Sequence, residues 1–208
     1  MEYKEIKDYA EKYAVPIMRN ETSKLIADFV KKNQPKNILE IGTAIGYSGI
    51  IMLKNSDANL ITIEHNKNYI KQAKLNFKSF DLRKRVTILD GDCLVVLANM
   101  ICEKKYLNHF DLIFLDGPKA QYEKMLDMLI LLLKPNGTLI VDDVLFHQNL
   151  NKEHKVSRRF KTISSRLEKF IEKCKNNPNF SEFDIKDIED GLIFAKKRTQ
   201  WKIKILNC

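Results

Sequence analysis

The sequence lacks several features that mark whole classes of proteins. No apolar run approaches the length of a membrane-spanning helix, and residues 1–6 lack the apolar core of a secretory signal. The four cysteines form no CxxC pair and are scattered at Cys93, Cys102, Cys174 and Cys208. This spacing argues against a zinc site and against a disulfide framework. We therefore expect a cytoplasmic protein in a reducing compartment, without a membrane partner.

The composition is that of a globular protein, and its positive charge is unevenly distributed. The 208 residues are 44% hydrophobic and 30% charged, with a net charge of +9. Residues 147–208 hold 15 Lys/Arg and 8 Asp/Glu, a surplus of 7, whereas residues 1–146 hold 21 and 19, a surplus of 2. An excess of positive charge that is confined to one part of the chain indicates a polyanionic partner. A lysine-rich composition without such a partner is the alternative.

Short apolar runs alternate with amphipathic stretches along most of the chain. After an N-terminal helical region at residues 1–34, the runs predict strands at 37–41, 60–64, 86–89, 110–116, 138–144, 183–188 and 191–195. Helical spacing is found at 45–54, 68–80, 94–101, 121–133 and 152–175. This alternation predicts an α/β fold with a Rossmann-like, doubly wound sheet of seven strands, mostly parallel. The short link between the last two strands predicts an antiparallel C-terminal hairpin.

Two groups of helix-breaking residues fit this scheme. Lys134-Pro135-Asn136-Gly137 predicts a turn between a helix and the fifth strand, and Asn176-Asn177-Pro178 predicts the end of the long helix. The chain contains no domain-scale linker. We expect a single domain over residues 1–200, followed by a tail at 201–208.

The loop after the first strand has the features of a nucleoside site. That strand ends in Glu40-x-Gly42-x-x-x-Gly46, and a helix follows directly. Gly42 allows a sharp turn and a close approach to a ligand, and Gly46 allows tight packing where the helix begins. The second strand ends in Glu64, which can accept hydrogen bonds from both ribose hydroxyls. After the third strand, Asp92 can meet an adenine amino group.

The glycine spacing separates this loop from other nucleotide-binding loops. It is neither the GxGxxG of dinucleotide folds nor the GKS or GKT of a P-loop. ExGxxxG, followed by an acidic strand end and then Gly-Asp, resembles the Rossmann-like S-adenosylmethionine-dependent methyltransferases over residues 35–195. The resemblance implies S-adenosylmethionine as the cofactor, bound by Val15, Glu40, Gly42, Ala44, Gly46, Ser48, Glu64, Asp92, Cys93 and Asp116. Alternatively, the two glycines only build a tight turn.

Acidic residues also end the fourth and fifth strands. Asp116 ends the fourth, and Asp142 and Asp143 lie on the fifth, its predicted neighbour. Two unit charges about 4 Å apart interact by roughly 4 kcal/mol at an effective dielectric near 20, so three carboxylates would repel strongly. Either some bind protons or a cation lies among them, and oxygen ligands favour Mg²⁺, Mn²⁺ or Ca²⁺. Alternatively, Asp142 or Asp143 caps the next segment and points into water.

A lysine completes this second group. Next to a cation, Lys119 should have a lowered pKa and could accept a proton from a substrate hydroxyl. Asp116, Lys119, Asp142 and Asp143 together resemble the catechol-type, metal-dependent O-methyltransferases. The resemblance implies that the three aspartates bind Mg²⁺ or Mn²⁺, that the metal binds two adjacent substrate oxygens, and that Asp116 and Lys119 are catalytic. The family usually has Asn where this sequence has Asp143, which puts the metal's identity and affinity in doubt.

Four segments show a narrower resemblance. Residues 9–18, 35–48, 142–146 and 191–197 are similar to the bacterial tRNA 5-hydroxyuridine methyltransferases. The resemblance implies O-methylation of 5-hydroxyuridine at tRNA wobble position 34 to 5-methoxyuridine, by a homodimer. Four cations near the start of the long helix would then contact phosphates of the tRNA anticodon stem-loop: Lys155, Arg158, Arg159 and Lys161.

Two other functions remain open at this point. Methylation of a small catechol-like phenol needs the same metal chemistry but no polyanion-binding surface. A non-catalytic RNA-binding module would keep the fold and bind tRNA without the cofactor. The four cations could equally be solvated surface charges.

Overall fold

The computed structural model describes residues 3–145 and 158–199, and for residues 158–161 it describes the backbone alone. The chain forms two compact units, Met1–Val96 and Leu97–Cys208. The expected single domain over residues 1–200 stays a prediction, and the tail at 201–208 lies outside the described residues. None of the helices in the described ranges has the length and apolarity needed to cross a membrane.

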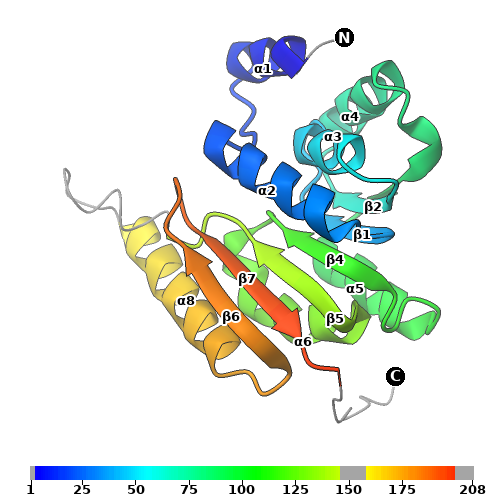
Figure 1. Ribbon diagram of the computed structural model, residues 1–208. Helices are drawn as coiled ribbons and strands as arrows, with labels where there is room; N and C mark the ends of the chain where they lie inside the picture. The colour runs from blue at the N-terminus through cyan, green and yellow to red at the C-terminus, as the bar shows by residue number, and fades with distance from the viewer. Residues whose placement is uncertain (1–2, 146–157, 200–208) are drawn as a thin grey trace. The chain divides into compact units, whose positions relative to one another are not determined.

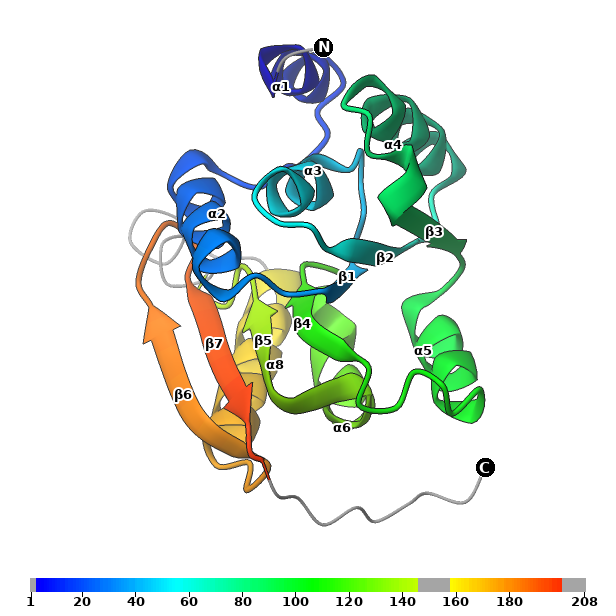
Figure 2. The same ribbon diagram turned by 45° about the vertical axis from the view of Figure 1, so that its right-hand side comes forward.

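The first unit contains three parallel strands in the order β3-β2-β1. Strand β1 (Asn37–Ile41) pairs with β2 (Asn59–Glu64), which pairs with β3 (Val86–Asp90), and Figure 2 shows the three side by side. Because the strands are parallel, the loops that follow them emerge at one edge. The helices of this unit are α1 (Tyr3–Lys12), α2 (Asn20–Asn33), α3 (Tyr47–Lys54), α4 (Lys67–Ser79) and the 3-10 turn η1 (Arg83–Arg85).

Helix α3 is the most deeply buried helix segment of the first unit. Every residue from Tyr47 to Leu53 is buried, as its apolar sequence requires. A Cβ on Gly49 would lie 2.8 Å from Leu60 of β2 and 3.0 Å from the ring of Phe77 of α4. The missing side chain therefore lets α3 pack closely against both neighbours, which fixes the loop that leads into it.

The second unit contains four strands in the order β4-β5-β7-β6. Strand β4 (Phe110–Leu115) is parallel to β5 (Leu133–Val141), and the antiparallel pair β6 (Phe180–Lys186) and β7 (Leu192–Lys197) follows. Figure 1 shows β7 between β5 and β6. Its helices are α6 (Tyr122–Leu132), α8 (Arg158–Lys175) and the 3-10 turn η2 (Lys119–Gln121); α5 (Cys93–Cys102) spans the boundary between the units.

Helices α6 and α8 pack against each other. The rings of Tyr122 and Phe170 lie 5.4 Å apart in an edge-to-face contact. The apolar residues Leu167, Phe170 and Cys174, spaced by three and four, are buried, and α8 ends at Lys175, as the breaker after it predicts. The predicted start of this helix at residue 152 lies outside the described residues.

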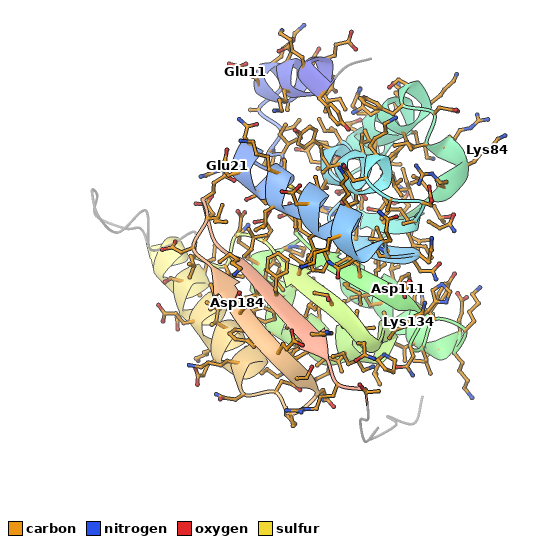
Figure 3. All side chains as sticks on the ribbon, viewed as in Figure 1. Glu11, Glu21, Lys84, Asp111, Lys134 and Asp184 are labelled. Atoms are coloured by element: carbon orange, nitrogen blue, oxygen red, sulfur yellow. The ribbon has the colours of Figure 1, made fainter. Side chains whose placement is uncertain are left out.

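Residues 134–137, predicted as a turn before the fifth strand, lie within the bounds of β5, and Asn136 has a left-handed φ of 63°, so the chain turns here inside the strand. Leu133 already pairs with Phe110 of β4, and the ladder resumes where Thr138 pairs with Leu112. The four residues between them form a bulge, held on both sides by strand pairing. Lys134 and Asp111, which Figure 3 labels, form an ion pair of 2.8 Å across the two strands. The strand therefore begins directly after α6.

The C-terminal hairpin is confirmed, but its boundaries differ from the prediction. Strand β6 begins at Phe180 rather than at residue 183, and five residues, 187–191, connect it to β7. Glu189 and Gly191 have φ angles of 53° and 80°, which take the connection out of the strand conformation. Likewise β5 ends at Val141, since Asp143 has φ 58° and cannot continue the strand predicted to reach residue 144.

Candidate functional site

Glu40 forms the centre of a buried hydrogen-bond network in the first unit. Its side chain is fully buried at the end of β1. The Ser48 hydroxyl donates to Oε1 at 2.5 Å, and the Thr62 hydroxyl donates to Oε2 at 2.6 Å. The hydroxyls of Thr43 and Thr62 lie 2.6 Å apart. These contacts offset the cost of burying the carboxylate and tie β1, β2 and α3 together below the glycine loop.

Glu64 fixes the backbone of two loops. Its Oε2 accepts from the backbone N–H of Ala44 at 3.0 Å, and its Oε1 accepts from those of His65 and Asn66 at 2.9 Å. An ionised carboxylate has about four acceptor sites, so these three bonds leave acceptor capacity for a ligand hydroxyl. The side chain is 8% exposed, at the edge where the strand ends meet. The predicted ribose contact stays a prediction.

The glycine loop has the backbone conformation that its sequence predicts. Gly42 and Gly46 have φ angles of 101° and 84°, a region that favours glycine. The backbone N–H of Gly42 donates to the carbonyl of Ile63 at 3.0 Å, which holds the loop against β2. A Cβ on Gly46 would lie 3.0 Å from the ring of Phe77, which confirms the predicted tight packing at the helix start. Ala44, between them, also has a positive φ of 43°.

Asp92 caps a helix. Its Oδ1 accepts from the backbone N–H groups of Leu94 and Val95 at 2.9 and 3.4 Å, in the first turn of α5. Burial and the neighbouring Asp92 raise the pKa of the Cys93 thiol, so it is not an activated nucleophile. Val15 is buried at the end of the α1 segment. The adenine contact of Asp92 and the cofactor contacts of Val15 and Cys93 stay predictions.

The second unit brings its predicted carboxylates to one edge. Leu115 of β4 pairs with Val141 of β5, so Asp116 and Asp142 follow at the same level. The backbone N–H of Asp142 donates to the carbonyl of Leu115 at 3.0 Å. Asp142 is 5% exposed, so the alternative that its side chain points into water is wrong.

In this arrangement Asp116 and Asp142 bind protons more tightly than an isolated aspartate does. Burial, together with the negative charge of Asp143, raises the pKa of Asp116 to about 6. Burial, together with Asp116 and Asp143, raises the pKa of Asp142 to about 8. The ammonium of Lys119 opposes both shifts. The predicted repulsion among the three carboxylates is therefore present.

Lys119 supplies the nearest positive charge. Its Nζ lies 2.6 Å from Oδ2 of Asp143, with the two side chains 22% and 31% exposed. The backbone N–H of Asp143 donates to Oδ1 of Asp142 at 2.7 Å, and the hydroxyl of Tyr122 donates to the backbone carbonyl of Asp142 at 3.5 Å. A lysine in an ion pair is an ammonium and cannot accept a proton, so a role as base requires this pair to open.

The three aspartates suit a divalent cation in their chemistry. They offer only oxygen donors, and a nearby cation would relieve the repulsion that raises two of their pKa values. Within residues 3–145 and 158–199, however, no three acidic, histidine or cysteine side chains are placed so that they could hold an ion together. In the described arrangement Lys119 balances the charge of Asp143.

The predicted RNA contacts lie where side chains are not described. Lys155 falls outside the described residues, and Arg158, Arg159 and Lys161 lie at the start of α8, described by its backbone alone. Their contact with phosphates stays a prediction. The sequence did not lead us to Thr43 and Thr62, which are buried beside Glu40. The available signal was Thr62 itself, a polar residue between two apolar ones in the predicted strand 60–64.

A Rossmann-like α/β arrangement, with a glycine turn and acidic strand ends, defines a class of nucleoside-binding proteins. Comparison with known proteins narrows this class. Residues 3–198 match the family described as O-methyltransferase, and the chain therefore belongs to the O-methyltransferase family.

Individual relatives are consistent with this membership. A catechol O-methyltransferase of Niastella koreensis is 37% identical over 112 residues, 53% of this chain and 49% of that protein. Caffeoyl-CoA O-methyltransferase 2 of Petunia hybrida is 26% identical over 148 residues, 69% of this chain and 61% of that protein. The matched part thus spans about half to three-fifths of these relatives.

Solved structures confirm the fold class. A caffeoyl-CoA O-methyltransferase candidate from Staphylococcus aureus is 32% identical and superimposes with a TM-score of 0.82, covering 95% of this chain and 92% of that one. An O-methyltransferase from Bacillus cereus in complex with SAH, 23% identical, gives a TM-score of 0.79 over 94% and 90%. The predicted Rossmann-like sheet of seven strands, mostly parallel with antiparallel C-terminal strands, is therefore confirmed.

Proposed function

We propose that this protein is an S-adenosylmethionine-dependent O-methyltransferase. The observation that carries the proposal is the group of three aspartates and Lys119 at the ends of β4 and β5, in a chain of the O-methyltransferase family. The glycine loop of the first unit, anchored by Glu40 and Glu64, supports the choice of an adenosine-containing methyl donor.

The residues of the first unit would bind and orient the donor. S-adenosylmethionine, when bound, supplies an electrophilic methyl group. Glu64 would accept hydrogen bonds from the ribose hydroxyls with its remaining acceptor capacity. Glu40, held by Ser48 and Thr62, would keep the loop in one conformation. Preorganisation of this kind places the methyl group for an in-line attack.

The residues of the second unit would handle the acceptor. Asp116, Asp142 and Asp143 would hold Mg²⁺ or Mn²⁺, which favours the oxyanion form of a nearby hydroxyl. Lys119 would leave Asp143, release its proton to solvent and then, as a neutral amine, take the proton of the acceptor hydroxyl. This division assigns deprotonation to Lys119 and metal binding to the three aspartates.

The proposed acceptor is 5-hydroxyuridine at the wobble position of tRNA, where O4 and the 5-oxygen are adjacent. Two observations support it: the four segments similar to the tRNA 5-hydroxyuridine methyltransferases, and the positive surplus of 7 in residues 147–208. We also propose a homodimer, which analytical ultracentrifugation would test.

A small catechol-like phenol is the second candidate acceptor. The 37% identity to the Niastella koreensis catechol O-methyltransferase favours it. The two candidates differ in their response to salt. Phosphate contacts make RNA affinity fall steeply with ionic strength, whereas turnover of a neutral phenol should change little.

The test in cells is the nucleoside composition of tRNA. Mass spectrometry of tRNA from a deletion strain should show loss of 5-methoxyuridine, restored by the wild-type gene. Complementation with Asp142→Ala should fail, whereas Asp184→Ala, the same change at an exposed position of β6, should succeed. Unchanged 5-methoxyuridine in the deletion strain would reject the tRNA substrate.

A further inference from the structure

Helix α4 and the turn η1 carry an unusual concentration of positive charge. Residues 67–85 contain seven Lys/Arg and a single acidic residue, Asp81. This local surplus of 6 is three times the surplus of 2 for the whole of residues 1–146. The charge count over residues 1–146 conceals this local surplus, because acidic residues elsewhere in that stretch cancel the positive charge.

Two of the seven cations have structural partners. Lys67 forms an ion pair with Asp90 at the end of β3. The guanidinium of Arg85 donates to the carbonyls of Leu53 and Ser56 at 2.7 Å and to that of Ala58 at 3.3 Å. Arg85 thus ties η1 to the chain between α3 and β2, whereas Lys67 is 77% exposed in a surface ion pair.

The other five cations are exposed, and none has an ion pair or side-chain hydrogen bond to another described residue. We call them the α4 basic surface: Lys71, Lys74, Lys78, Arg83 and Lys84.

Three members of this surface share one face of α4. Lys71, Lys74 and Lys78 are spaced by three and four residues, which places them on one face of α4 over about 10 Å. Arg83 and Lys84 continue the row on η1, and Figure 3 shows Lys84 extending away from the molecule. Like charges at this spacing destabilise a helix slightly, so the row carries a cost that a polyanion would remove.

A hollow lies beside the row. Its volume is about 350 Å³, and Lys74, Lys78 and Arg83 contribute to its lining. The rest of the lining is apolar: Leu75, Phe77, Val86 and Ile88. Leu75 is 52% exposed, one of three large apolar side chains exposed among the described residues, with Tyr13 and Val95. An apolar surface rimmed by cations is a feature of interaction sites rather than of inert surface.

We propose that the α4 basic surface binds the phosphate backbone of RNA, with a nucleobase packed against Leu75 in the hollow. A row of cations matches a chain of regularly repeated phosphates, and every base offers an apolar face. The choice of RNA over an acidic peptide rests on the proposed tRNA substrate. Helix α4 begins three residues after Glu64, so the row starts near the nucleoside-site edge of the first unit and extends away from it.

The test measures RNA binding directly, without methyl transfer. The probe is a fluorescently labelled tRNA transcript, and its affinity for the full chain is measured at several salt concentrations. The test variant is Lys74→Gln/Lys78→Gln/Arg83→Gln. The matched control removes three other exposed charges of the same unit, Lys31→Gln/Lys32→Gln/Lys54→Gln. Circular dichroism and thermal unfolding verify that both variants fold.

The expected result is a change in salt dependence as well as in affinity. Loss of three phosphate contacts should flatten the slope of log K against log salt by about 2–3. Between 50 and 200 mM salt the wild type should then lose about 20- to 40-fold more affinity than the variant. The control should behave as the wild type. Leu75→Ser should weaken binding without a change of slope, because its contact carries no charge.

Three outcomes would overturn the proposal. The first is a test variant with wild-type affinity and slope, and the second is a control variant that weakens binding equally. The third is competition by poly-glutamate as effective as that by unlabelled tRNA, which would assign the surface to an acidic protein. The proposed function fails separately: a tRNA that binds through this surface but is never methylated would reject the reaction and leave the surface standing.

Discussion

The last strand of the second unit ends in a fully buried lysine, Lys197. Its ammonium donates three hydrogen bonds, to Oδ1 of Asn108 at 2.8 Å and to the carbonyls of Ile130 and Leu133 at 2.7 Å. These acceptors lie where α6 passes into β5, so the lysine joins the end of β7 to that corner. The protonated amine has three N–H groups, so only the charged form can donate to all three oxygen acceptors.

Replacement of this lysine by methionine should destabilise the protein. An unsatisfied buried acceptor costs about 1–3 kcal/mol, so the two buried carbonyls would cost about 2–6 kcal/mol, whereas the half-buried Asn108 can turn to water. Methionine fills a similar volume and removes the cost of burying the ammonium, which offsets part of this loss. We therefore expect Lys197→Met to lower the free energy of unfolding by about 2–5 kcal/mol.

The neighbouring residue provides the control. Lys196 lies on the opposite face of β7, 3.3 Å from Glu182, with the two side chains 41% and 70% exposed. An exposed pair of this kind contributes about 0–1 kcal/mol, so Lys196→Met should change stability little. Urea unfolding followed by circular dichroism measures both variants. Equal stability of the two variants would refute the reasoning.

The pH dependence gives an independent readout of the same residue. Burial lowers the pKa of Lys197 from 10.5 to about 7. Between these values the unfolded chain binds a proton that the folded chain releases, so stability should rise with pH. The wild type should therefore gain stability relative to Lys197→Met from pH 7 to 10. A constant difference between them over this range would contradict the assignment.

Three further predictions concern the two sites. Gly46→Ala should destabilise by about 1–4 kcal/mol in urea unfolding, because φ is 84° and the new Cβ would lie 3.0 Å from Phe77. In EDTA, the free energy of unfolding of the wild type should fall as pH rises from about 4 to 8, since the folded state keeps protons on Asp116 and Asp142 that the unfolded state releases. The Asp142→Asn variant should show a smaller fall. Addition of Mg²⁺ at pH 8 should stabilise the wild type but not this variant. Lys119→Met should abolish methyl transfer while S-adenosylmethionine binding, measured by calorimetry, persists.

The first strand and its loop could be predicted closely from the sequence. The apolar run at residues 37–41 is β1 with the same boundaries, and the positive φ angles of Gly42 and Gly46 follow from their spacing. These features depend on local signals: an apolar run, glycines at a turn, and a helix directly after it. The convergence of Asp116 with Asp142 also follows from local signals, once the strands are taken as neighbours.

Features set by tertiary contacts were not predictable in this way. Residues 134–137 carry a strong turn signal and do turn at Asn136, but strand pairing with β4 on both sides places this turn in a bulge inside β5. Lys119 offers no sequence signal for its pairing with Asp143, because the contact joins residues 24 apart on different elements. The basic row on α4 was visible as lysine spacing, but the charge count over 146 residues averaged it away.

The most direct test of the proposed activity is methyl transfer by the purified protein. The protein is incubated with S-adenosylmethionine, Mg²⁺ and either tRNA that contains 5-hydroxyuridine or a catechol, and the products are analysed by mass spectrometry. We predict 5-methoxyuridine in the tRNA, formed in Mg²⁺ but not in EDTA, and absent with Asp142→Ala. Methylation of the catechol alone would move the assignment to a small phenol. No methylated product from either acceptor, with S-adenosylmethionine bound to the protein, would contradict the account.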